Sequence, residues 1–277
     1  MPLAHRRARW RIVVATAVVI VLGAAGFVVI PYVFREHPGP KSLHAAVKAF
    51  QGKESTPTSN RTLRNDLPAE GVYPVNGQGT ERISFPPNSQ RDGAVMPVTI
   101  TYLADGCWRW HIDYNVAHWE EYDFCPRGDR LLLAGNRDSQ SWDFGDIKVN
   151  NLARFTCPSV SVVLPQDPKP GQTQRYSCTG TNTAVSGRSI AATTVRIVGI
   201  VTLRIGGVVV PTIHELQQVT LTGGQRGRVR EDWWFTASSG LPVRVERQIT
   251  LFSNSPIGTI TYNEVGSWQM TSLRPQT

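Results

Sequence analysis

The stretch that decides the fold is GCWRWHIDYNVAHWEEYDFC, residues 106–125. Its two halves, 107–114 and 118–125, alternate between apolar and polar residues, which is typical of β-strands. Antiparallel pairing about Asn115-Val116-Ala117 places Cys107 opposite Cys125. That register gives each face matched cross-strand partners: Trp108 with Phe124 and Trp110 with Tyr122 on one face, and Arg109 with Asp123 and His111 with Glu121 on the other. A shift by one residue would mix the faces, so we predict this register and a Cys107–Cys125 disulfide.

The two remaining cysteines, Cys157 and Cys178, are then left to pair with each other. Their loop contains Pro165, Pro168 and Pro170, and a disulfide would hold this proline-rich excursion in place. Metal binding is the alternative for the cysteines. No C-x-x-C spacing occurs, however, and the histidines are not clustered near both pairs. We therefore expect two structural disulfides, in a compartment that permits them.

Outward from this hairpin, the chain after residue 70 consists of period-two segments separated by Gly, Pro, Asn and Ser. The clearest expected strands are Val98–Tyr102, Cys107–Tyr114, His118–Cys125, Arg130–Ala134, Thr194–Arg204, Val208–Leu221, Arg228–Thr236, Leu241–Phe252 and Thr259–Glu264. Long consecutive antiparallel strands predict a mainly β domain, residues 71–277, that forms a meander rather than a doubly wound sheet. We expect a curved antiparallel sheet, either a half-barrel or barrel-like, with one or two short helices; a closed barrel and a sandwich both remain open.

The sequence predicts two further turns in this domain. Gly206-Gly207 lies between two expected strands, as in a tight hairpin. The residues Ala237-Ser238-Ser239-Gly240 predict a second hairpin. We expect it to set Phe235 opposite Leu241 and Trp233 opposite Val243.

The N-terminal part contains one long apolar run, IVVATAVVIVLGAAGFVVIPYV, Ile12–Val33. A helix needs about 20 apolar residues to cross a membrane, so we predict a single transmembrane helix over 12–34 that acts as a signal-anchor. Four arginines precede it in a basic tail, residues 1–11, which the positive-inside rule keeps in the cytoplasm. The β domain is then extracytoplasmic. A cleaved signal peptide is the alternative and would also export the domain, but the run exceeds the usual length and lacks a small-x-small site.

A linker with one short helix is expected between the membrane and the β domain, over residues 35–70. The linker is rich in Pro, Ser, Thr, Asn and charge. Within it, Leu43, Val47 and Phe50 have helical spacing, and Ser42 is available as an N-cap. This amphipathic helix could dock on the body or on a partner.

The charge balance argues against nucleic-acid binding. The formal net charge is +8, and four of these charges belong to the basic tail, which leaves +4 for the rest of the chain. No dense Lys/Arg stripe with interleaved aromatic residues occurs.

The sequence contains no convincing catalytic or metal-binding motif. His214-Glu215-Leu216-Gln217-Gln218 resembles the start of a HExxH zinc motif, but Gln218 replaces the second histidine and the segment alternates like a strand. A second cluster, interpreted as a solvated face whose charges pair across strands, comprises His111, His118, Glu120, Glu121 and Asp123. The carboxylate spacing of Asp143 and Asp146 is common in loops. Because G-x-S-x-G and phosphate-binding loops are also absent from the sequence, we expect no enzyme activity, no metal and no cofactor.

What stands out is the aromatic content of the expected strands. Packing in the core is the ordinary role of such rings. The functional alternative is that one face of a curved sheet lines an apolar cavity. The candidate ligand-binding residues on that face are Trp108, Trp110, Tyr122, Trp233 and Phe235.

Several segments resemble an uncharacterised group of actinobacterial single-pass, membrane-anchored envelope proteins. They are the basic tail with its helix, SLHAAVKAF, EGVYPVNGQG, DGCWRW with FCPRGD, and GLPVRVERQ. More distantly, the long antiparallel strands and the segment 224–244 are similar to the half-barrel lipid carriers of the LolA/LppX type. That resemblance implies a curved sheet that can enclose lipid. Those carriers are generally lipoproteins, whereas this chain has no lipid-attachment cysteine.

The interpretation that joins these observations is a cell-envelope protein, anchored by one helix, whose β domain binds an apolar ligand. We expect that ligand to be a lipid sequestered by aromatic residues near the membrane. The alternative is a non-enzymatic accessory module that docks on a membrane or cell-wall protein. An enzyme that acts on envelope polymers comes third. A filled cavity, an exposed apolar patch and a cleft with converging acid and base groups would support the three in turn.

Overall fold

The computed structural model describes residues 38–52, 67–104, 106–145, 147–255 and 258–277. The predicted cytoplasmic tail and transmembrane helix therefore lie outside the described residues. Within the described ranges, no helix has the length and apolar character that crossing a membrane requires.

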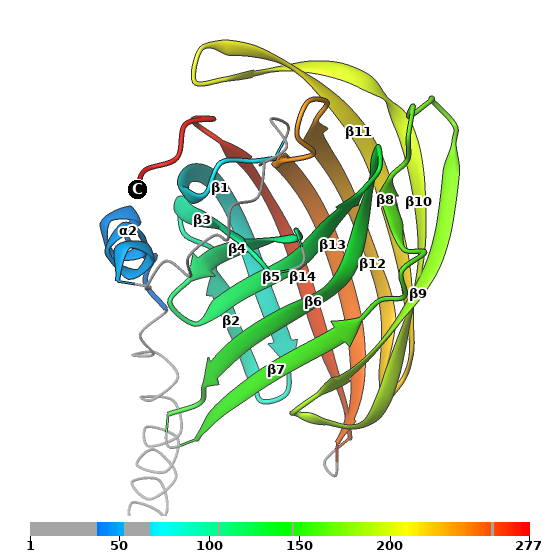
Figure 1. Ribbon diagram of the computed structural model, residues 1–277. Coiled ribbons are helices and arrows are strands. Elements are labelled where there is room, and N and C mark those ends of the chain that lie inside the picture. The colour runs from blue at the N-terminus through cyan, green and yellow to red at the C-terminus, as the bar shows by residue number, and fades with distance from the viewer. Residues whose placement is uncertain (1–37, 53–66, 105, 146, 256–257) are drawn as a thin grey trace, which may run out of the picture.

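The β domain forms a closed antiparallel barrel of twelve strands (Figure 1). In barrel order, these strands are β1 (Gly71–Ser84), β3 (Val95–Tyr102), β4 (Trp108–Asn115), β5 (His118–Arg127), β6 (Arg130–Asp143), β7 (Lys148–Thr156), β9 (Thr173–Asn182), β10 (Val185–Ile205), β11 (Val208–Gly223), β12 (Gln225–Thr236), β13 (Pro242–Ser255) and β14 (Gly258–Met270). Two short strands lie off this path: β2 (Pro87–Arg91) pairs with β1, and β8 (Val162–Leu164) pairs with β6.

The pairing of β1 with β14 closes the barrel. It runs from Val75 opposite Met270 to Ile83 opposite Tyr262. The mainly β, barrel-like meander is confirmed, and of the shapes left open by the sequence the closed barrel is the one that forms. The open half-barrel is wrong because β1 supplies a partner for the last strand. We did not expect a strand there, since Pro74, Gly77 and Gly79 weaken the alternation of the segment.

The hairpin of β4 and β5 has the predicted register, with Trp108 opposite Phe124 and Trp110 opposite Tyr122. Both disulfides form as expected, Cys107–Cys125 and Cys157–Cys178. Disulfides of this kind indicate an extracytoplasmic protein.

The pairing next to the turn between β12 and β13 departs from expectation, by one residue at Phe235 and by two residues at Trp233. Trp233 lies opposite Val245 and Phe235 opposite Pro242, with an irregularity between Trp234 and Phe235. The turn is longer than expected because Gly240 donates its N–H to the carbonyl of Thr236 and adopts a positive φ. From Trp233 away from the turn the slip is two residues, which keeps those side chains on the same face of the sheet, so the inward stripe of β13 is preserved.

The helix α2 (Leu43–Gln51) lies on the outside of the barrel, against β1 and β3 (Figure 1). The Ser42 side chain caps it by accepting a hydrogen bond from the Ala45 N–H at 3.1 Å. Lys41 forms an ion pair with Asp113 of β4 at 2.8 Å, which fixes the chain as it enters the barrel. The predicted helix and its cap are confirmed. Because α2 docks on the outer wall, it leaves the interior uncovered.

One half of the barrel interior is solid. Its centre is an aromatic core, which we define as Trp108, Trp110, Phe124, Trp233, Phe235 and Trp268. All six side chains are buried, and the ring centroids of Trp110 and Trp268 are 5.2 Å apart. The long β10–β11 hairpin arches over this end of the barrel (Figure 1), and the Gln269 side chain donates a hydrogen bond to the Arg204 carbonyl. Large rings fill this half because a barrel of many strands has a wide interior.

Candidate ligand-binding cavity

The other half of the barrel contains a cavity of about 370 Å³. Phe85, Phe144 and Val149 line the cavity at the end of the barrel where β1 turns into β2 and β6 turns into β7, and we call this end the mouth. The cavity walls come from the inward positions of the surrounding strands and are mainly apolar: Ile83, Trp142, Phe155, Val219, Leu221, Val229, Ile249, Leu251 and Ile260. The deep end, which we call the floor, is polar and meets the aromatic core.

The structure divides the five predicted ligand-binding residues. Tyr122 lines the cavity, and its ring lies 5.3 Å from that of Trp233 and 5.8 Å from that of Trp110. The other four belong to the aromatic core beneath the floor. Their role in ligand binding stays a prediction. The sequence contained a signal for the actual walls, because Ile249 and Leu251 continue the inward stripe of β13.

Arg247 of β13 dominates the floor. Its guanidinium donates to both carboxylate oxygens of Glu120, at 2.7 and 2.9 Å, and to Glu264 of β14, at 3.0 Å. The Arg247 Nε lies 2.7 Å from the second Glu264 oxygen, and the Tyr114 hydroxyl accepts a further bond. Burial alone would raise the pKa of Glu120, but the Arg247 charge holds that pKa below its usual value. Two carboxylates and a hydroxyl therefore engage this cation from every side.

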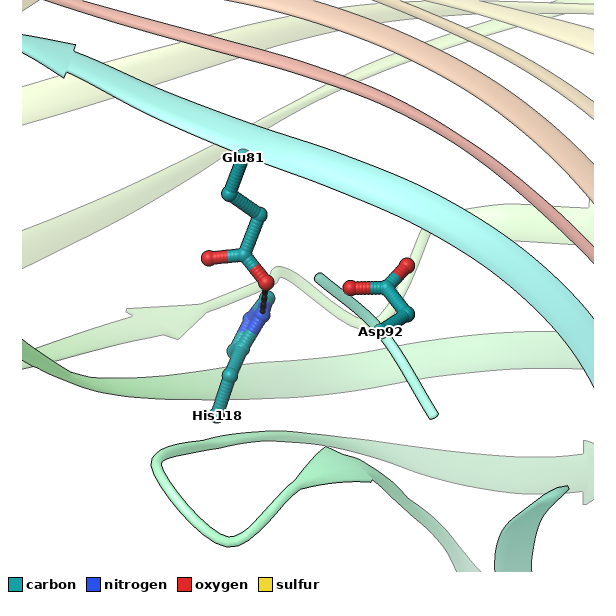
Figure 2. A group of neighbouring side chains, drawn as sticks. All are labelled: Glu81, Asp92 and His118. Carbon is teal, nitrogen blue, oxygen red and sulfur yellow. Dashed lines mark hydrogen bonds and ion pairs between the residues drawn. The ribbon is translucent and has the colours of Figure 1, made fainter. Parts of the chain in front are cut away.

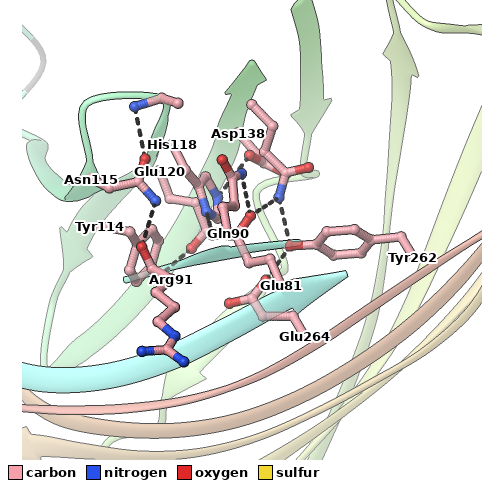
Figure 3. A network of polar contacts seen from close by, with 12 residues as sticks. Glu81, Gln90, Arg91, Tyr114, Asn115, His118, Glu120, Asp138, Tyr262 and Glu264 are labelled. Carbon is pink, nitrogen blue, oxygen red and sulfur yellow. Dashed lines mark hydrogen bonds and ion pairs between the residues drawn. The ribbon is translucent and has the colours of Figure 1, made fainter. Parts of the chain in front are cut away.

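His118 is the second buried cation (Figure 3). Its Nδ1 lies 2.6 Å from Glu81 and its Nε2 lies 3.2 Å from Asp138. Burial alone would lower the pKa of His118, but these carboxylates raise it well above the ordinary value, so the ring holds both protons. Gln90 and Gln140 also donate to Glu81, and Gln140 donates to the Tyr262 hydroxyl at 2.6 Å.

The interpretation of the β5 charges as one solvated face is wrong for two of its members. His118 and Glu120 occupy the same alternate positions as Tyr122, and they point into the barrel with exposures of 0% and 6%. Their neighbours behave as predicted on the outer face, where Arg109 bonds Asp123 at 2.7 Å and His111 bonds Glu121 at 3.1 Å.

Two groups of side chains bring potential metal ligands together: Glu81, Asp92 and His118 (Figure 2), and His118, Glu120 and Asp138. His118 belongs to both, and both of its ring nitrogens already bind carboxylates. A metal would have to displace a proton from a histidine whose pKa is raised. These contacts fit a protonated histidine better than a metal ligand, and the expectation of no metal stays a prediction.

Two further carboxyl groups face the interior, and neither forms an ion pair with a cation among the described residues. Glu231 accepts a hydrogen bond from Trp233 Nε1 at 3.1 Å, and burial raises its pKa to about 6. Glu215 accepts one from the Gln217 amide at 2.6 Å, and burial raises its pKa to about 8. His214 lies on the opposite, outer face of β11 and binds Asp232 at 2.9 Å. The HE pair therefore splits across the sheet, as the strand interpretation predicts.

The fold and its interior define a class: a closed antiparallel β-barrel, filled at one end and hollow at the other. No protein-family model matches the chain, and no curated protein matches it. Among solved structures, the chain is similar to the hypothetical lipoprotein YmcC from Escherichia coli (K12), with 13% identity. The match covers 76% of this chain and 90% of that protein, with a TM-score of 0.33. At that TM-score, the likeness assigns neither a family nor a ligand.

Proposed function

We propose that this protein binds a single-chain apolar ligand, a lipid, in the hollow half of its barrel, at the outer side of a membrane. The observation that carries the proposal is the cavity itself, which has apolar walls, an open mouth and a closed polar floor. Small-ligand sites are typically concave and mostly apolar, with a few polar groups that fix orientation.

The dimensions favour one alkyl chain. Ligand sites in proteins commonly enclose about 300–1,000 Å³, and 370 Å³ lies near the lower limit. Each buried methylene of such a chain contributes about 0.8 kcal/mol from the hydrophobic effect. A lipid with two long chains would need more room than the cavity provides.

The position of the tether supports a mouth that faces the membrane. Pro38 lies in a groove with Arg82 and Ser89, next to the β1–β2 turn that borders the mouth. The predicted transmembrane helix ends at residue 34, and four extended residues span at most about 14 Å. Apolar side chains are exposed around the mouth, with Phe85 at 50% and Ile147 at 65%. A ligand could then pass between membrane and cavity over a short, apolar path.

Filling the cavity tests this proposal. The full chain is extracted in mild detergent and examined by native mass spectrometry, and we expect a discrete adduct of single-chain lipid mass. Val219→Trp should abolish the adduct because Val219 lines the wall. The matched control is Val265→Trp, on the outer face at 61% exposure, which should retain it. An apo mass for the unsubstituted chain, or an adduct that survives Val219→Trp, would refute the proposal.

A docking module is the second candidate, and one observation favours it. The β10–β11 hairpin exposes Ile200, Val208 and Val209 at 57–61%, an apolar surface at the end remote from the mouth. A photo-crosslinker at Val209 should then capture one membrane or cell-wall protein in intact cells, whereas a crosslinker at Phe85 should not. Capture at Phe85 alone, or at neither position, would count against docking through the hairpin.

A further inference from the structure

We infer that the ligand of this cavity is a cationic amphiphile, whose alkyl chain lies along the apolar walls and whose ammonium group binds at the floor against Glu231. The inference rests on the proposed function and deepens it by naming the ligand's head group. Fatty acids and phosphate-bearing lipids have anionic head groups, which the arrangement of charges in the floor disfavours.

The first argument is that the floor offers an anion no free cation. Every donor nitrogen of Arg247 already contacts Glu120, Glu264 or Tyr114. His118 is held in the same way between Glu81 and Asp138. A carboxylate or phosphate would have to displace a buried carboxylate from one of these cations, which leaves that carboxylate unpaired in a place of low dielectric.

The second argument is the excess of carboxyl groups. In the described part of the interior, the cations are Arg247 and His118. They face a larger set of acids: Glu81, Glu120, Asp138, Glu215, Glu231 and Glu264. Each cation is already shared between two of these acids. Burial raises the pKa of Glu215 and of Glu264 to about 8, so both are mostly protonated at neutral pH, and Glu231 is the ionised carboxylate that remains to attract positive charge.

The third argument is the environment of Glu231, which is 5% exposed and lines the cavity. Within the described ranges, its hydrogen-bond partner is the neutral indole N–H of Trp233. Arg247 influences Glu231 through space, but its donors are used by other groups. Burial raises the pKa of Glu231 to about 6, so at neutral pH it is mostly an ionised carboxylate with no ion-pair partner. Such a group is costly to bury alone and gains most from a cation.

An ammonium group suits these surroundings. It carries three N–H donors and no acceptor, which matches a floor rich in carboxylate acceptors. A hydrogen bond to a charged group is also stronger than one between neutral groups. The alkyl chain of the same molecule would extend from Glu231 past Val229 and Leu251, which line the wall toward the mouth.

Three probes with the same chain and different heads test this inference: decylamine, decanol and decanoate, each brominated at the tail. The full chain is held in nanodiscs of zwitterionic lipid at pH 7.5. Bromine quenches nearby indoles, so the difference between the unsubstituted chain and Trp142→Phe gives the signal of the cavity residue Trp142. Each affinity is expressed as the ratio between the chain with Glu231 and Glu231→Gln, which cancels the partition of a probe into the bilayer.

We expect Glu231→Gln to weaken decylamine by about tenfold or more and not to weaken decanoate. Decanol should change little, and its binding shows that the variant cavity is intact. The matched control Glu246→Gln, on the outer face of the adjacent β13, should leave all three affinities unchanged.

Two outcomes overturn these ideas separately. If Glu231→Gln leaves decylamine unchanged, or weakens decanoate or decanol as much as decylamine, the head-group inference is wrong while ligand binding stands. If none of the probes quenches Trp142, the proposed function itself fails.

Discussion

The two halves of the barrel interior are built by the same strands and differ completely in content. On β5, Phe124 joins the aromatic core while Glu120 lies in the floor, four residues away. On β12, Trp233 is followed two positions toward the mouth by Glu231, and on β14 Trp268 and Glu264 show the same change. Aromatic rings fill one half, whereas in the other half ion pairs between buried side chains border an open cavity. The comparison shows that the fold and the cavity depend on different residues. A few inward-facing side chains on each strand decide whether that strand fills the barrel or lines a cavity.

The largest effect should come from the solid half. Trp110→Ala removes a fully buried ring that packs against Tyr122, Trp233 and Trp268. We expect a loss of about 4–5 kcal/mol in the free energy of unfolding, because the cavity left behind cannot collapse. Urea unfolding followed by circular dichroism measures it. The control is Trp142→Ala in the hollow half, where the lost ring borders existing space and the cost should be smaller. Equal losses would erase the distinction between the halves.

The floor should come next. Arg247→Met leaves Glu120 and Glu264 without their shared cation, and we expect a loss of about 3–4 kcal/mol. The same substitution on the outer face, Arg109→Met, should cost at most about 1 kcal/mol, because its pair with Asp123 is partly exposed to solvent. The triple change Arg247→Met, Glu120→Gln and Glu264→Gln should recover much of the stability. Failure to recover would mean that the network supplies more than charge balance.

A smaller effect, with a defined pH dependence, is expected at Glu215. Burial raises its folded-state pKa to about 8 from an ordinary value of 4.5, so the folded protein binds the extra proton between these values. Stability attributable to Glu215 is then greatest below pH 4.5 and falls as the pH rises toward 8. Glu215→Gln keeps the acceptor for Gln217 and removes the titration. We expect it to stabilise the protein at pH 9 by on the order of 2 kcal/mol and to change little at pH 5.

Urea midpoints at both pH values measure this difference. Glu231, Gln217 and Tyr176 surround Glu215 and remain in the variant, so they serve as a constant background. A Glu215→Gln variant with an unchanged pH profile would show that the side chain is already hydrated in the folded state.

Local patterns predicted the parts of this fold that depend on neighbours in sequence. The β4–β5 register followed from the alternation of Trp108 and Trp110 against Phe124 and Tyr122, and the cysteine pairing followed from that register. Closure could not be predicted in this way. It joins β1 to β14 across most of the chain, and Pro74, Gly77 and Gly79 hide β1 from any periodicity test.

The candidate site was missed for a related reason. His118 and Glu120 have the period of Tyr122, which would have placed them inside, but charged side chains are normally assigned to solvent. Only the closed barrel brings Arg247 from β13 and Glu264 from β14 against them. The sequence around residues 135–143 also lacks alternation, because the inward positions Asn136, Asp138 and Gln140 are themselves polar.

The closing contact of β1 with β14 also has a meaning for how the protein is made. β14 is the last strand of the barrel to leave the ribosome and, on export, the last to cross the membrane, so the strand that β1 awaits arrives after all the others. Until then, both edges carry unpaired N–H and C=O groups that could pair with any other extended chain. Contacts between such distant segments also form slowly. Before β14 pairs with β1, the protein is therefore an open sheet. To reach the folded state, it must keep its two unpaired edge strands from pairing with other chains.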